Sequence, residues 1–235
     1  MITKYGLPQV AVYPGLMIIC MVGLAVLFYP AGWLIPVELI LLVLTVWIVS
    51  FFRDPPRKIA ADESILVSPC DGAVTEIEDE GPEIRISMFL SLFNVHISRA
   101  PCSCEAVSVT YKKGEYRDAR DPESARLNES NTLLLVRLAE PFETITVKLV
   151  SGAIARHIVC AIKEGHTLNQ GERFGMIKFG SRTELIIPNG GGREICVKLG
   201  DKVKAGLTPL VRYSNSELRT QNSGDEGYVT PSTDN

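Results

Sequence analysis

Residues 174–188 read FGMIKFGSRTELIIP, two short apolar runs that meet at Gly180-Ser181. Both runs are typical of β-strands, because short apolar stretches bounded by turn residues favour strands. The junction lacks the Asn-Gly or Asp-Gly pair that favours a tight hairpin turn. The stretch therefore predicts β-structure on both sides of a lone serine at an unusual bend.

The same pattern of short apolar runs continues over most of the chain. From Ile65 onward, short β-like runs such as EIRISMFL and NTLLLVRLA are separated by Gly, Pro, Asn and Asp. This pattern predicts a mainly β fold, a sandwich or barrel with some α-helix. The run LGDKVKAGLTPLV, residues 199–211, resembles the final hairpin of biotinyl/lipoyl-type barrels. Residues 214–235 are polar, and we expect a disordered tail there.

The first fifty residues differ from the rest, because no charged residue lies between Lys4 and Glu38. Val10–Tyr29 and Leu34–Phe52 are two apolar segments, each about long enough to cross a ~30 Å hydrocarbon layer as a helix. A cleaved signal peptide fits poorly, since the apolar region is double and lacks an A-x-A exit. The sequence favours a helical hairpin anchor and leaves open whether it spans the membrane, lies in the interface, or forms buried core helices.

Positive charges lie outside the hairpin, at Lys4 before it and at Arg53, Arg57 and Lys58 after it. By the positive-inside rule both ends are cytoplasmic, which places the protein at the cell membrane with its β domain on the cytoplasmic side. The prolines of RDPPRK end the second helix. We therefore expect an anchor at residues 1–58, a β domain at 59–213 and a tail at 214–235.

Composition excludes several function classes. The net charge of −3 offers no basic face for nucleic acid. The six cysteines are scattered, and only Cys102 and Cys104 lie close together. A single C-x-C pair is weak evidence for a zinc site. Reduced cytosolic thiols and no metal site are expected. The chain also lacks a P-loop, a Rossmann fingerprint, an H-E-x-x-H site and a G-x-S-x-G elbow.

Titratable groups that could activate a hydroxyl are few. His96 alternates with apolar residues in FNVHISRAP and is expected to share a face with polar neighbours. His157 lies in an expected strand, and His166 lies in a polar turn. Asp71, in SPCDGAV, is also a standard turn residue. Together Asp71, His96 and Ser181 make a carboxylate, a base and a hydroxyl, the set that activates a serine, although most proteins contain such a set.

Several longer motifs carry a family resemblance. The chain resembles the phosphatidylserine decarboxylase proenzymes of the short, archaeal-type group. The matching stretches run through residues 50–212 and include FFRDPPR, VSPCDGAVTEIE, FLSLFNVHISRAP, YKKGEYRDAR, LNESNTLL and VKLGDKVKAGLTPL. RFGMIKFGSR and NVHISRAP are the most specific, and the order and spacing of the whole set make coincidence a poor explanation.

The resemblance implies that the chain cuts itself between Gly180 and Ser181. The Ser181 Oγ would attack the Gly180 carbonyl carbon and turn the peptide into an ester, and elimination across Ser181 would leave dehydroalanine. Hydrolysis then releases ammonia and leaves a covalent pyruvoyl group, the only cofactor. Gly180 has no Cβ and so admits a close approach to its carbonyl. The large chain, 1–180, and the small chain, 181–235, would stay together as a heterodimer, with a higher oligomer left open.

The implied reaction is the decarboxylation of phosphatidylserine to phosphatidylethanolamine and CO₂. The resemblance implies a Schiff base between the pyruvoyl carbonyl and the serine amine of the head group, which acts as an electron sink for the departing carboxylate. A diacyl lipid leaves a bilayer at a cost of roughly 0.8 kcal/mol per CH₂, which explains an anchor beside the site. The sequence leaves open whether the lipid is a diacyl or an archaeal ether lipid.

Carried over residue by residue, Asp71 and His96 match the family's Asp and His that support self-cleavage. Longer bacterial enzymes have a second histidine three positions earlier, where this chain has Phe93, so that role does not transfer. His96 is the expected proton donor in decarboxylation, with His157 in reserve. The family-like stretch LNESN suits loop anchoring at least as well as substrate contact, through Asn128, Glu129 and Asn131.

Two other classes remain open on the residues alone. A membrane-tethered biotinyl/lipoyl-like carrier would be modified at Lys178, which lies between apolar residues in GMIKFG. A membrane-bound serine hydrolase would use Ser181, His96 and Asp71. Only the decarboxylase interpretation predicts that the chain is found as two fragments, the shorter of which has an N-terminus blocked by a pyruvoyl group.

Overall fold

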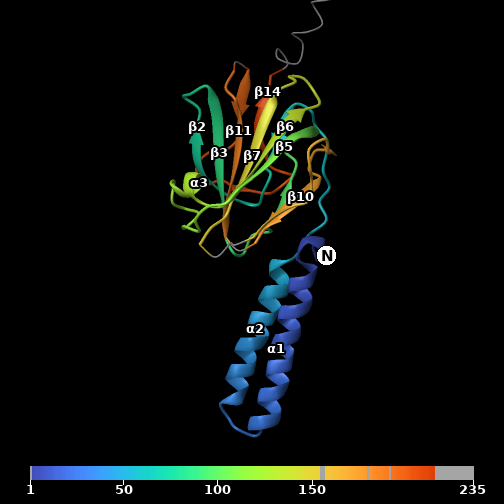
Figure 1. Ribbon diagram of the computed structural model, residues 1–235, viewed down its shortest axis with the longest axis vertical. Coiled ribbons are helices and arrows are strands. Elements are labelled where there is room, and N and C mark those ends of the chain that lie inside the picture. Colours follow the sequence, from blue (N-terminus) through green and yellow to red (C-terminus); the bar gives the residue numbers. More distant parts are fainter. Residues whose placement is uncertain (1, 154–156, 179, 191, 215–235) are drawn as a thin grey trace, which may run out of the picture.

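The computed structural model describes residues 2–153, 157–178, 180–190 and 192–214. A β domain carries two antiparallel helices that project from one end as a hairpin (Figure 1). The expected mainly β fold with an N-terminal helical hairpin is confirmed. The expected tail lies, apart from Ser214, outside the described residues.

The helical elements are few and short outside the hairpin. They are η1 Lys4–Gly6, α1 Leu7–Phe28, α2 Leu34–Phe51 and α3 Ser124–Leu127. The strands are β1 Ile65–Val67, β2 Gly72–Glu78, β3 Glu83–Leu90, β4 Ile97–Arg99, β5 Cys104–Lys112, β6 Ser130–Arg137, β7 Thr144–Val150, β8 Ile158–Cys160, β9 Thr167–Leu168, β10 Arg173–Ile177, β11 Ser181–Pro188, β12 Arg193–Ile195, β13 Lys202–Val203 and β14 Pro209–Tyr213.

The two hairpin helices are apolar and little buried. Both are long and apolar enough to cross a membrane, and only 6% and 11% of their most apolar windows are buried. The 22 residues of α1 rise about 33 Å, close to the thickness of a hydrocarbon layer. Core helices of a soluble domain would be buried instead. The helices therefore indicate membrane association.

The β domain consists of one large antiparallel sheet and two small ones. The large sheet has the strand order β13-β2-β3-β11-β7-β6-β5-β9, and the small sheets are β4-β10-β8 and β1-β14-β12. Side chains from all three sheets share one hydrophobic core, which includes Met88, Leu133, Phe174 and Leu210. Apolar burial of this extent is the main stabilising term of the fold.

The expected hairpin in residues 199–211 is wrong. β13 pairs with β2 at the edge of the large sheet, whereas β14 pairs with β1 and β12 in a small sheet. The turn between them crosses from one sheet to another, held by hydrogen bonds of Ser68 with Gly206 and Thr208. Local pattern could not show this, because strand partners come from distant parts of the chain.

The runs on either side of Gly180 are both strands, but they belong to different sheets. β10 lies between β4 and β8, and β11 lies between β3 and β7 in the centre of the large sheet. Gly180 is therefore the point where the chain leaves one sheet and enters another. β11 starts at the end of the β domain that faces the helical hairpin (Figure 1).

A second, smaller core joins the hairpin to the β domain. We call it the junction core, and its buried members are Phe51, Phe52, Val95, Ile97 and Met176. Polar contacts reinforce the junction, since Asp54 forms ion pairs with Arg99 at 3.3 Å and Arg173 at 2.7 Å. The base of the hairpin is thereby packed against the sheet of β4 and β10.

Candidate active site

Ser181 is the first residue of β11 and is fully buried. It lies opposite Leu90 of β3 in the large sheet. Among the described residues, its Oγ is one of eight buried side-chain oxygens without a hydrogen-bond partner. An unpaired buried hydroxyl costs about 1–3 kcal/mol, so an unsatisfied one in a core position calls for an explanation.

Gly180, just before Ser181, has a left-handed backbone with φ of +71°. Other L-residues adopt this conformation at a cost of roughly 1–2 kcal/mol. Gly152 packs directly on it, because a Cβ built on Gly152 would lie 2.4 Å from the Gly180 carbonyl oxygen. The absence of two Cβ atoms thus allows the Gly180 carbonyl to sit tightly against the loop after β7.

His96 lies beside Gly180 and is fully buried. Its Nδ1 lies 2.9 Å from the Asn94 carbonyl oxygen, which can only accept, so Nδ1 carries the proton. Nε2 is then the acceptor, and it receives the Gly180 backbone N–H at 3.3 Å. Val95 and Ile97 on either side of His96 belong to the junction core.

The environment of His96 keeps its imidazole neutral. Burial is the main cause that lowers its pKa from 6.5 to about 4, and the positive charge of Arg53 acts in the same direction. The hydrogen bond to Asn94 and the negative charge of Asp71 oppose this fall in the pKa. At neutral pH the ring is therefore an unprotonated base at Nε2, whose lone pair accepts the Gly180 N–H.

Asp71 is buried, but its partner is an arginine. Arg57 binds both carboxylate oxygens at 2.7 and 2.8 Å, and the Ala205 N–H donates at 2.8 Å. Within the described part of the chain, no hydrogen bond joins Asp71 to His96. Asp71 acts on the imidazole through its charge alone, so these three residues do not form the carboxylate–imidazole–hydroxyl relay of a serine hydrolase.

The remaining candidates from the sequence lie away from this cluster or are inaccessible. His157 is exposed, precedes β8 rather than lying in a strand, and contributes its backbone carbonyl to Lys178. His166 is exposed in a turn, as expected. Lys178 is 6% exposed, and burial lowers its pKa. A carrier lysine must reach a modifying enzyme, so its burial argues against the carrier class.

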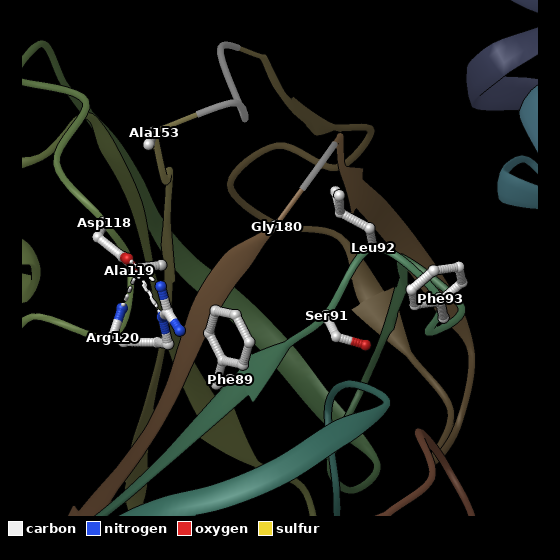
Figure 2. A pocket seen from close by; sticks show the side chains of 9 residues that line it. All are labelled: Phe89, Ser91, Leu92, Phe93, Asp118, Ala119, Arg120, Ala153 and Gly180. Carbon is white, nitrogen blue, oxygen red and sulfur yellow. Dashed lines mark hydrogen bonds and ion pairs between the residues drawn. The ribbon is translucent and has the colours of Figure 1, made fainter.

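A pocket of about 330 Å³ opens beside Gly180. Figure 2 shows the Ser91–Phe93 loop on one side of it and the Asp118–Arg120 loop on the other, with Phe89 on its floor. Asp118 and Arg120 form an exposed ion pair at 2.5 Å. The pocket thus combines apolar walls with one charged side and reaches the backbone of the Gly180-Ser181 junction.

The LNESN residues anchor loops next to this junction. The Asn128 side chain bonds the backbone of Arg117 and the Ser151 carbonyl, and Glu129 accepts the Tyr116 hydroxyl. Ser151 precedes Gly152, so Asn128 also holds the segment that packs on Gly180. Asn131 lies in β6, with its Oδ1 buried and unpaired.

Three residues near the site were not singled out from the sequence. Asn94 orients His96 and could have been noticed two positions before it. Gly152 is one glycine among nineteen, with no local feature that marks its packing on Gly180. Phe51, the last residue of α2, lies against the His96 ring at a centroid distance of 4.4 Å. Its contact joins residues 45 positions apart, which no local pattern reveals.

Sequence comparison places this chain among proteins of one family. The family model for phosphatidylserine decarboxylase matches residues 44–210. A phosphatidylserine decarboxylase proenzyme from Syntrophus aciditrophicus is 38% identical over 194 residues, covering 80% of this chain and 88% of that protein. One from Chlorobium chlorochromatii is 39% identical over 220 residues, covering 91% and 100%. A putative archaetidylserine decarboxylase proenzyme from Methanopyrus kandleri is 37% identical over 193 residues, covering 77% and 88%. The chain therefore belongs to the phosphatidylserine decarboxylase family of pyruvoyl-dependent lyases.

Proposed function

We propose that this chain is a proenzyme that cuts itself between Gly180 and Ser181 and then decarboxylates phosphatidylserine. The observation that carries the proposal is the buried, unpartnered Ser181 Oγ next to Gly180, whose N–H points at a neutral imidazole. These features suit Ser181 as the source of a pyruvoyl group, since a hydroxyl that is to attack its own backbone needs a free lone pair and a nearby base.

In the first step, His96 is the base for Ser181. Nε2 releases the Gly180 N–H and accepts the Oγ proton, while Oγ bonds to the Gly180 carbonyl carbon. The bond from that carbon to the Ser181 nitrogen breaks, and the nitrogen takes the proton back from His96. The product is an ester with a free amine, so atoms and charges balance. The Asn94 carbonyl holds the imidazole in the tautomer that this step needs.

In the second step, the ester becomes a leaving group. Removal of the Ser181 Cα proton expels Oγ with the Gly180 carboxylate. This breaks the covalent link between residues 1–180 and residues 181–235. Water then replaces the nitrogen at Ser181, and ammonia leaves. Serine suits this position because its Oγ can both attack a carbonyl and depart by elimination.

In decarboxylation the pyruvoyl carbonyl supplies an electron sink for the substrate amine, so that the carboxylate can leave as CO₂. The pocket beside Gly180 is the proposed site of the head group. Arg120 is placed to attract the phosphodiester, and Phe89, Leu92 and Phe93 provide apolar contact. His96 is the proposed donor of the proton that replaces the carboxylate: Nε2, unprotonated in the neutral ring, first takes a proton from the substrate's ammonium group and then gives it to the carbon that has lost CO₂. Phe93 stands where longer relatives have a second histidine.

The hairpin brings this pocket to the lipid. We propose that α1 and α2 span the membrane with both ends on the cytoplasmic side, next to Lys4, Arg53, Arg57 and Lys58. The start of β11 faces the hairpin, which supports access from the membrane surface (Figure 1). Retention in the membrane fraction after carbonate extraction is expected. Release into the soluble fraction would contradict a spanning hairpin.

The function is tested by comparing the wild-type chain with Ser181→Ala. The wild type should run as two fragments on a denaturing gel, with a small chain blocked to N-terminal sequencing, and should release CO₂ from phosphatidylserine in vesicles. Ser181→Ala should remain one 25.8 kDa chain without activity. Normal cleavage and turnover by this variant would contradict the proposal. Parallel vesicles with an archaeal ether-linked serine lipid decide which lipid backbone is preferred.

A further inference from the structure

The end of the membrane hairpin touches the proposed catalytic base. The rings of Phe51 and His96 lie 4.4 Å apart between centroids, at an interplanar angle of 38°. Phe51 is 1% exposed and His96 is fully buried, so the contact excludes water from that face of the imidazole. Phe51 is the last residue of α2, whereas His96 lies between β3 and β4.

Both partners of this contact are held by the junction core. Phe51 packs edge-on against Phe52 at 5.1 Å and lies 6.2 Å from Trp47. Val95 and Ile97, the neighbours of His96, belong to the same core. The position of the His96 ring therefore depends on how the hairpin is seated.

A hydrogen bond ties the two segments together next to the ring contact. Arg53, two residues after Phe51, donates to the Phe93 carbonyl at 2.5 Å and to the Ser50 carbonyl at 3.0 Å. Phe93 lies three residues before His96, on the loop that also lines the pocket. The hairpin base thus holds the His96 loop by a ring contact on one side and a charged hydrogen bond on the other.

We propose that Phe51 is a positioning residue for self-cleavage, so that the membrane hairpin completes the active site rather than serving only as a tether. This inference rests on the proposed role of His96 as the base. Phe51 does not touch the scissile bond. It acts by excluding water from the imidazole and by limiting the rotation of the ring, so that Nε2 keeps its hydrogen bond from the Gly180 N–H.

The physical reason lies in what the ring would meet without Phe51. A small side chain at position 51 opens a space beside the imidazole, and water entering it would stabilise the imidazolium. The charged groups that act on His96 from the described residues are Arg53, after α2, and Asp71, between β1 and β2. Neither group is replaced in a Phe51 variant. A change in the pKa of His96 would therefore come from the access of water to the ring and from the position of the ring.

The test uses the full-length chain made in a cell-free system with membranes, with self-cleavage followed on gels after shifts to different pH. Phe51→Ala should slow self-cleavage at neutral pH by about tenfold or more, because small misplacements of a catalytic group are costly. Its loss of rate on acidification should begin about one pH unit or more above that of the wild type. Phe51→Leu, which keeps apolar volume but not the flat ring, should be intermediate.

Val46→Ala is the matched control, since Val46 lies on the same helix, is 60% exposed and belongs to neither hydrophobic core. It should cleave like the wild type at every pH. Carbonate extraction checks that each variant is inserted. Should Phe51→Ala fail to insert, the cleavage rate and the pH profile of Phe51→Leu test the inference instead.

The outcomes separate this inference from the proposed function. A wild-type rate and pH profile in the inserted Phe51 variant, with His96→Ala uncleaved, would overturn the positioning role and leave His96 as the base. Normal cleavage by His96→Ala would overturn the proposed function itself. A slower rate with an unchanged pH profile and equal slowing in Val46→Ala would show only a general effect of the hairpin and would also contradict the inference.

Discussion

The backbone N–H of Gly180 donates to Nε2 of His96 at 3.3 Å, so one neutral imidazole faces the residue that precedes Ser181. The partner of its Nδ1 is a backbone carbonyl, that of Asn94, and not a carboxylate. This arrangement differs from the hydrolase pattern, and it sets the expected effects of mutations around the junction.

His96→Ala should slow self-cleavage by roughly 10²–10⁴-fold, the usual range for a lost general base. The ratio of uncut to cut chain during a pulse and chase measures this. His166→Ala is the control, because His166 is exposed in a turn of the β domain. Equal cleavage in the two variants would exclude His96 as the base.

Asp71→Asn should lower stability as well as slow cleavage, because it weakens the buried pair with Arg57, in which the side chains are only 6% and 11% exposed. Removing one partner of a buried pair costs about 3–5 kcal/mol. Arg57→Gln should have parallel effects on thermal unfolding and on cleavage. If Asp71→Asn blocked cleavage while Arg57→Gln left both properties unchanged, Asp71 would act directly on His96 instead.

Gly152→Ala should slow self-cleavage, because the added Cβ would lie 2.4 Å from the Gly180 carbonyl oxygen and one of the two backbones must move. A displacement of this kind is expected to cost about tenfold or more in rate. Gly81→Ala is the matched control, since a Cβ there meets nothing within 4 Å. Cleavage of Gly152→Ala at the wild-type rate would show that the Gly180 carbonyl tolerates movement.

Arg120→Glu should raise the KM for phosphatidylserine vesicles by about tenfold while self-cleavage stays normal, because the charge facing the pocket is reversed against an anionic head group. Arg126→Glu provides the control. Arg126 is equally exposed and paired with a nearby carboxylate, that of Glu123, but it lies on α3 outside the pocket lining. An equal rise in KM for both variants would point to general attraction of the lipid surface.

The uncut Ser181→Ala protein should lose stability as the pH falls from 6.5 toward 4. The pKa of His96 is lower in the folded chain, about 4, than its ordinary value of 6.5, so the unfolded chain binds more protons in this window. At about 1.4 kcal/mol per pH unit, the loss from this group amounts to about 3 kcal/mol. Denaturant unfolding at several pH values measures it.

Adding His96→Gln should remove this part of the pH dependence, whereas adding His166→Gln should retain it. Because the carboxylates titrate equally in both double variants, the difference in slope isolates the imidazole. Identical slopes would mean that His96 is accessible to protons in the folded state.

Local features of the chain were enough to predict several parts of the molecule. The two apolar segments of the first fifty residues predicted the helical hairpin, because each is about long enough to cross a hydrocarbon layer as a helix. Short apolar runs separated by turn residues predicted the β domain, and an ordered set of motifs, above all RFGMIKFGSR and NVHISRAP, indicated the family. These features depend on residues close together in sequence.

The tertiary structure alone decided which strands pair, that β10 and β11 belong to different sheets, and that His96 is buried. It also decided that Asp71 binds Arg57, that Gly152 packs on Gly180, and that Phe51 lies on His96. The physical reason is that burial, pKa shifts and close backbone approach arise from contacts between distant segments. The sequence by itself determined which groups are available for the proposed chemistry, and packing determined which of them meet.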